Sequence, residues 1–206
     1  KNDPANTLYA LDLIRDEPDK TRYEEKYSLA VLRGKEPETF KTQVAYLRGL
    51  ASIETGQFSQ AVKVLQPLKK EKSLKGFILY NLGIALLQSG DEQQGLKTFD
   101  ELGRQEFNET GLLALKDKTN LKLAYFYLDK GNAKKAKLYF ERVRLDGPYS
   151  NRALLGAGWV SVAQGRFDRA LVPWSILHKR AETNYSVQEV LMAVPYAYSK
   201  LEAYGN

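Results

Sequence analysis

The chain has 206 residues and a mass of 23.4 kDa, and it is 43% hydrophobic and 27% charged. This balance is typical of a folded protein, and the length suffices for one ordinary core or for several small stacked units. No apolar run approaches the ~20 residues that cross a bilayer. The absence of Cys excludes disulfides, thiolate nucleophiles and Cys-ligated zinc, but it leaves the compartment open. The net charge of +6 permits contact with nucleic acid or anionic lipid without indicating either.

The segment 1–38 is predicted to form a helical pair or a degenerate repeat. Two stretches with helical patterns, "ANTLYALDLIRDE" and "TRYEEKYSLAVLRG", are separated by "EPDK", and Pro37 is expected to open the next helix. The chain starts without Met or an apolar leader and stops within a repeat, so we expect the complete protein to extend in both directions.

The rest of the chain has an internal repeat with a spacing of 34 residues. Equivalent positions at this spacing are Gly49 and Gly83, Gly56 and Gly90, Leu65 and Phe99, Gly131 and Gly165, and Ala136 and Ala170. Between the second and third units the spacing is 41, so seven extra residues lie around 103–115. The pattern predicts four units over 39–182, followed over 183–206 by the first helix of a truncated fifth unit.

Each unit is predicted to be two helices joined by a tight turn. The first helix has apolar residues at three-and-four spacing, as in "LYNLGIALL". The Gly of "SGD", "KGN" or "QGR" closes this helix in a left-handed conformation, and Asp91 or Asn132 caps the second helix. Pro195 predicts a kink or a late start in the fifth unit. Small residues stand where the two helices must approach closely, at Gly49, Gly83, Ala124 and Gly158.

The 34-residue period with the pattern L-G, then G, then A, then F, then P resembles the tetratricopeptide repeat over residues 42–182. The resemblance implies an all-α fold, a right-handed α-solenoid of helix-turn-helix repeats whose first helices line the concave side. The chain departs from the family pattern at Gly95, where Ala is usual, at Arg48, where Leu is usual, and in the insertion.

The resemblance also assigns the residues that line the concave groove. This surface is aromatic and aliphatic, and large apolar surfaces usually mark interaction sites, at which Tyr and Trp concentrate. The predicted partner-binding residues are Tyr46, Phe77, Tyr80, Asn81, Ile84, Lys118, Lys122, Tyr125, Arg152, Trp159, Met192 and Tyr196. The alternative for several groove positions, such as Ile84, is packing between neighbouring helices.

Two charged features offer further candidate sites. Asn81, Lys118 and Lys122 match or nearly match a family clamp for a C-terminal carboxylate, but Tyr46 and Leu50 stand where its first Lys and Asn belong. Between residues 116 and 144, nine basic residues face three acidic ones. We interpret this region first as a solvated face, then as a site for an acidic protein, and last as a nucleic-acid site, because no aromatic residues interleave with the cations.

The sequence lacks the signatures of catalysis. His178 is the only histidine and lies near the end of a predicted helix beside Lys179 and Arg180, where solvation explains it. No P-loop, dinucleotide fingerprint or H-E-x-x-H occurs. We therefore predict a protein that is not an enzyme and has no cofactor and no metal site.

The resulting hypothesis is a protein-protein interaction scaffold that binds a peptide, helix or partner chain in its groove. The alternatives are an assembly or oligomerisation module that uses the edges, the convex face or the truncated ends, and a basic adaptor for nucleic acid or an anionic membrane surface. The stretch "ERVRLDGPYSNRALLGAGW", followed by "ALVPW", resembles uncharacterised exported bacterial tetratricopeptide proteins. This second resemblance implies a location in the periplasm or cell envelope.

Overall fold

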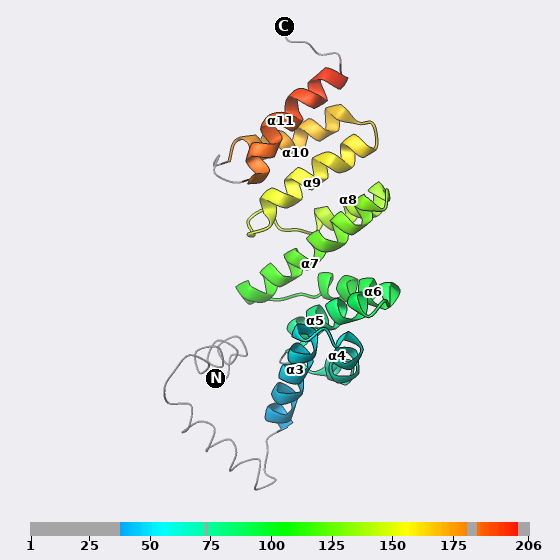
Figure 1. The fold of residues 1–206 in the computed structure, drawn as a ribbon. Helices are drawn as coiled ribbons and strands as arrows, with labels where there is room; N and C mark the ends of the chain where they lie inside the picture. Colours follow the sequence, from blue (N-terminus) through cyan, green and yellow to red (C-terminus); the bar gives the residue numbers. More distant parts are fainter. Residues whose placement is uncertain (1–37, 73, 181–184, 202–206) are drawn as a thin grey trace. The chain divides into compact units, whose positions relative to one another are not determined.

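The computed structural model describes residues 38–72, 74–180 and 185–201, so the predicted N-terminal helical pair lies outside the described residues. The described part of the chain is helical and contains no strand (Figure 1). Its helices are α3 (Glu38–Glu54), α4 (Phe58–Leu65), the short 3-10 helix η1 (Pro67–Lys70), α5 (Lys75–Gln88), α6 (Glu92–Gly103), α7 (Thr110–Asp129), α8 (Ala133–Glu141), α9 (Ser150–Ala163), α10 (Phe167–His178) and α11 (Tyr185–Lys200).

The predicted glycine turns join the two helices of each hairpin. A positive φ is found at Gly56, Gly90, Gly131 and Gly165. In each turn the amide after the glycine donates to a carbonyl five residues earlier, as from Asp91 to Leu86 at 2.9 Å. The next helix is then capped by a side chain in two hairpins: Asp91 accepts from the Gln94 amide, and Asn132 accepts from the Lys135 amide, both at 3.1 Å. The turn and cap predictions are confirmed at these positions.

The extra residues between the second and third repeats lengthen a helix. Helix α7 has 20 residues, whereas the corresponding helices α5 and α9 have 14 each. All three end two residues before their turn glycine, so the added length lies at the start of α7. The helix α11 begins at Tyr185, ten residues before Pro195, and runs past it to Lys200, so the late start considered for this helix does not occur.

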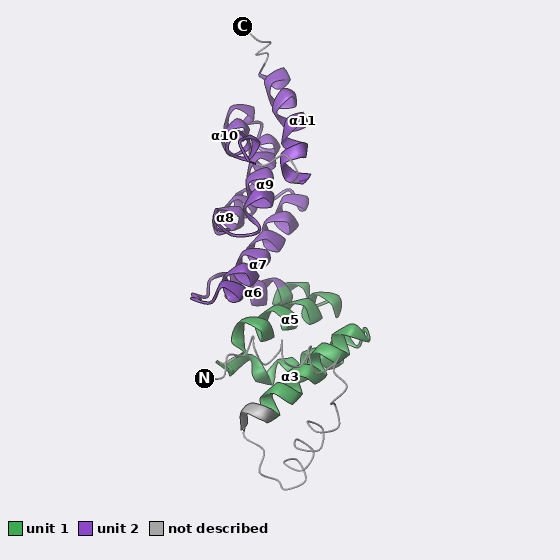
Figure 2. Ribbon diagram, turned by 90° about the vertical axis from the view of Figure 1, so that its left-hand side faces the viewer, with its two compact units in different colours: residues 1–95 green, residues 96–206 purple. Residues whose placement is uncertain are grey.

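The chain divides into two compact units, residues 1–95 and 96–206, with the boundary inside α6 (Figure 2). In unit 1, α3 packs against α4, and α4 packs against α5. A cluster of buried side chains that includes Leu65, Ile78 and Leu82 forms its core. Gly49 permits the close approach of α3 to α4, because a methyl group there would overlap Leu65.

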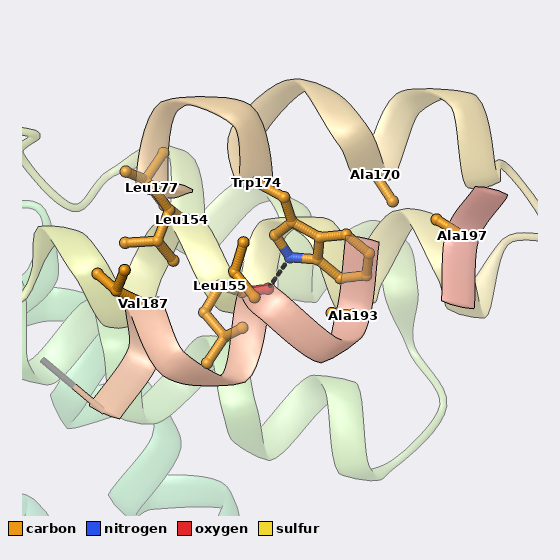
Figure 3. Close-up of a cluster of buried hydrophobic side chains, with 9 residues drawn as sticks. Leu154, Leu155, Ala170, Trp174, Leu177, Val187, Ala193 and Ala197 are labelled. Carbon is orange, nitrogen blue, oxygen red and sulfur yellow. Dashed lines mark hydrogen bonds between the residues drawn. The ribbon is translucent and has the colours of Figure 1, made fainter. Parts of the chain in front are cut away.

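The core of unit 2 is centred on Trp174 of α10, which is 0% exposed. Its indole Nε1 donates to the Leu155 carbonyl at 3.1 Å (Figure 3), and its ring lies where any side chain at Gly158 would overlap it. Val187 and Val190 of α11 complete this cluster with α9 and α10. The prediction of close helix contacts at Gly49 and Gly158 is confirmed, and Gly156, not predicted, serves the same purpose against Phe140.

A buried carboxylate fixes the segment between α8 and α9. Asp117 of α7 is 0% exposed and accepts from the Arg144 guanidinium at 2.8 and 2.9 Å and from the Arg144 amide at 3.2 Å. A buried charge is tolerated only when it is paired and hydrogen-bonded in this way. Arg144 therefore anchors the loop that leads into α9.

A second polar cluster joins α6 to α8 through Asp100. Its carboxylate accepts from Tyr139 at 3.0 Å, from Arg142 at 2.8 Å and from Arg104 at 2.9 Å. Burial acts to raise the pKa of Asp100, but the hydrogen bonds from Arg142, Arg104 and Tyr139 outweigh it and hold the pKa below its usual value. Burial, together with the Asp100 charge, raises the pKa of Tyr139 to about 12.

We expect Asp100 to contribute to the pH dependence of stability. The pKa of Asp100 is lower in the folded chain than in the unfolded chain, so ionised Asp100 adds to the free energy of unfolding. This contribution is fully present when the pH is above the pKa of the unfolded state, and it is lost as the pH falls through the pKa of the folded state. Asp100→Asn should therefore destabilise the protein at pH 7 by about 1–2 kcal/mol and less at strongly acidic pH. Urea unfolding at several pH values measures this, and an equal loss at every pH would contradict it.

Candidate functional site

The candidate site is the surface of the first helices of the hairpins, where the sequence places the partner-binding residues. In unit 1 these residues lie on α3 and α5. Asn81 donates both amide hydrogens, one to the Tyr46 hydroxyl at 2.8 Å and one to the Phe77 carbonyl at 3.0 Å. Its donors are thus already used, which counts against a role for Asn81 in gripping a carboxylate.

Tyr46 is a packing residue rather than a contact surface for a partner. It is only 3% exposed, and burial raises its pKa to about 12. Phe77 packs against the same core, and Tyr80 and Ile84 are half-buried. The predicted assignment of Tyr46 to the groove surface is therefore corrected, because the side chain fills the contact between α3 and α5.

The repeat register explains which groove positions are covered. Leu121 and Leu155, at the position equivalent to Tyr46, are 3% and 4% exposed. One helical turn later, Tyr125 and Trp159 are half-buried and present part of each ring. Sequence reasoning assigned both positions to the groove. The first is covered at Tyr46, Leu121 and Leu155 but only half-buried at Tyr80, and the second remains partly accessible at Tyr125 and Trp159.

In unit 2 a row of aromatic and charged side chains joins α7, α9 and α11. We call Tyr125, Arg152, Trp159, Glu189 and Tyr196 the aromatic strip. The Tyr125 hydroxyl donates to the Arg152 carbonyl at 3.1 Å, and the Arg152 guanidinium lies 5.9 Å from the Tyr125 ring centre.

The second half of the strip joins α9 to α11. Trp159 Nε1 donates to the Glu189 carboxylate at 2.9 Å, and its ring centre is 6.4 Å from that of Tyr196. Burial raises the pKa of Tyr125, which keeps its hydroxyl protonated as a donor at neutral pH. The strip is thus held in place by its own hydrogen bonds and keeps ring surface accessible.

The other predicted residues of this unit differ in exposure. Lys122 and Arg152 are exposed, and neither takes part in an ion pair among the described residues. Lys118 is half-buried. Met192 is 80% exposed and belongs to the outer side of α11 rather than to the contacts of the strip.

The basic region of residues 116–144 is largely engaged within the chain. Arg142 and Arg144 pair with Asp100 and Asp117, and Lys137 pairs with Glu141 at 3.7 Å. Several cations lie over rings: Lys130 is 5.6 Å from the Phe126 centre, Lys135 is 4.7 Å from Tyr127, and Arg142 is 4.9 Å from Tyr139. Aromatic residues therefore do accompany these cations, contrary to the interpretation of the sequence, but the cations already cover their faces.

No cluster suited to a metal ion occurs among residues 38–72, 74–180 and 185–201. His178, the last residue of α10, is exposed. None of the helices in these ranges combines the length and the apolar character needed to cross a membrane.

Comparison with known proteins finds a family match for part of the chain and similar folds among solved structures. Residues 121–174 match the family described as Tetratricopeptide repeat. The fold is similar to the structure of a mutant of MamA, with a TM-score of 0.53 and 17% identity over 81% of this chain and 91% of that one. It is also similar to nearly identical TPR-like repeats of a candidate kinesin light chain from Podosopora anserina, with a TM-score of 0.50 and 14% identity over 80% of this chain and 88% of that one. No curated protein matches the sequence.

These findings confirm the predicted fold class, an all-α solenoid of helical hairpins. The family match supports the tetratricopeptide repeat for residues 121–174. Proteins with this fold are in general non-catalytic scaffolds for protein-protein interactions.

Proposed function

We propose that the chain is a non-enzymatic scaffold that binds a segment of a partner protein along the aromatic strip of unit 2, in the concave groove expected for this fold. The observation that supports this most is the strip itself, in which Tyr125 of α7 is linked to α9 and Trp159 of α9 is linked to α11. A preorganised aromatic surface loses little side-chain entropy when a partner binds. Tyr, Trp and Arg are also the residue types that contribute most to protein interfaces.

The partner segment proposed here combines apolar side chains with carboxylates. The apolar side chains would contact the rings of Tyr125, Trp159 and Tyr196. Carboxylates would meet Lys122 and Arg152, whose charges are exposed and are not neutralised by an ion pair in the described part of unit 2. Glu189 keeps its negative charge while it accepts from Trp159, so the carboxylates of the partner are expected beside Lys122 and Arg152 rather than beside Glu189.

A peptide-display selection tests the proposal. Peptides enriched on the wild-type chain are measured by fluorescence anisotropy against Lys122→Glu/Arg152→Glu, which should weaken binding by about tenfold or more. The matched control is Lys134→Glu/Lys137→Glu, which makes the same change of charge at exposed positions of α8 and should leave affinity within about twofold.

A second variant, Tyr125→Ala/Trp159→Ala, removes the rings. Because these rings also pack on Phe140 and Trp174, its circular dichroism must first show that it is folded. Peptides that bind this folded variant and the charge-reversal variant as tightly as the wild type would refute the proposed site.

A further inference from the structure

The aromatic strip contains one cation, Arg152, and one anion, Glu189. The Glu189 side chain is half-buried, and one of its carboxylate oxygens accepts from Trp159 Nε1 at 2.9 Å. Its other oxygen has no partner, and Glu189 forms no ion pair, in the part of the chain that the structure describes. The neighbouring rings of Trp159 and Tyr196 also attract cations through their faces. This end of the strip is therefore suited to a positively charged group.

The two charges of the strip lie apart along α9. Arg152 is in the first turn of α9, and Trp159, which holds Glu189, follows about two helical turns later, or about 10 Å along the axis. Burial raises the pKa of Tyr125, and the charge of Arg152 opposes this rise while that of Glu189 adds to it. Both charges thus act within the strip. At physiological ionic strength, exposed charges about 10 Å apart largely screen each other's effect, so each acts on what lies directly against it.

The order of charges on α7 is the same as on α9. Lys122 lies one turn before Tyr125, and the exposed Asp129, the last residue of α7, lies one turn after it. On both helices a cation therefore precedes the ring, and an anion lies at or after the ring. Lys200 does not balance Glu189, because it is about 16 Å further along the axis of α11.

We propose that Glu189 selects a partner segment with a Lys or Arg that is separated from its carboxylates by its apolar side chains. This inference rests on the proposed function, because it concerns the same strip and the same partner. The carboxylates meet Lys122 and Arg152, and the basic side chain meets the unpaired oxygen of Glu189. A separation of about 10 Å corresponds to about three residues of an extended chain, so the order acid, apolar, base describes a short motif. Complementary charges of this kind contribute mainly to specificity.

A double-mutant cycle between Glu189 and the partner tests the inference. The probes are peptides selected by display on the wild-type chain, each synthesised with either Lys or Gln at its basic position. We expect the Lys peptide to bind the wild type about three- to tenfold tighter than the Gln peptide. Glu189→Gln should bring the ratio of the two affinities to within about twofold, because the amide oxygen still accepts from Trp159 but the charge is removed. The matched control Glu141→Gln makes the same substitution at an exposed position of α8 and should leave the ratio unchanged.

One further measurement needs no variant. On the wild-type chain, the preference for the Lys peptide should shrink at high salt. Selected peptides without a basic residue, a preference that salt does not change, or a preference that Glu189→Gln leaves intact would each overturn the inference. If the same peptides are sensitive to Lys122→Glu/Arg152→Glu, the proposed function stands without it. Peptides that are insensitive to that double variant and to loss of the rings would overturn the proposed function, and this inference with it.

Discussion

Trp174→Ala is expected to lower the free energy of unfolding by about 3–5 kcal/mol, the usual cost of removing a buried Trp. The side chain is fully buried, its ring centre is 5.1 Å from that of Trp159, and its indole Nε1 donates to the Leu155 carbonyl. The space beside Gly158 would become a cavity, because Gly has no side chain that could move to fill it. Chemical denaturation followed by circular dichroism measures the loss.

Trp174→Phe is the matched comparison for this prediction. Trp174→Phe keeps an aromatic ring in the site but removes the hydrogen bond to Leu155. It should therefore lower the free energy of unfolding by much less than Trp174→Ala does. If Trp174→Ala and Trp174→Phe lower the free energy of unfolding equally, the packing of the ring against Gly158 is not what stabilises unit 2.

Arg144→Met is expected to destabilise the protein by about 3–5 kcal/mol, because it leaves a buried charge without its partner. Asp117 is fully buried and would keep only the backbone amide of residue 144 as a donor. The expected structural result is release of the loop between α8 and α9, which hydrogen exchange of residues 144–150 can detect.

The double variant Asp117→Leu/Arg144→Met serves as the control, since it removes both charges and should recover much of the stability lost in the single variant. If the double variant is less stable than Arg144→Met, the loss of stability comes from the missing ion pair and not from a buried charge without a partner.

The repeat alone was enough to predict most of the helices, because the same local signals recur in each unit. The four turn glycines, the caps at Asp91 and Asn132 and the close contacts at Gly49 and Gly158 were all readable from this pattern. Each depends on backbone conformation or on side-chain size at a fixed position of the hairpin, and such signals need no knowledge of distant residues.

The polar contacts between helices were not predictable in the same way. Asp117 and Arg144 are 27 residues apart, and Asp100 and Arg142 are 42 apart, so neither pair follows the repeat period. Within the basic region, nothing in the order of residues distinguishes a lysine over a ring, such as Lys135, from an arginine paired with a buried carboxylate. These partners become apparent only once the helices are placed.

The candidate site was only partly predictable from the sequence. The repeat register predicts the same groove role for Tyr125, Trp159 and Tyr46, because periodicity does not separate two positions that lie one helical turn apart. Burial of Tyr46 follows from the approach of α3 to α5 and from its hydrogen bond with Asn81. A tyrosine at a packing position and one on a surface therefore look alike in sequence.

The glycine turns described above also have a consequence for how the chain folds. Each turn brings together residues that are close in sequence, and even the Arg142 to Asp100 contact spans only 42 of 206 residues. Chains dominated by such short-range contacts fold on the scale of microseconds to milliseconds, and repeat arrays can nucleate at any hairpin and propagate to its neighbours. A ribosome-bound chain could accordingly complete one hairpin before the next has been synthesised.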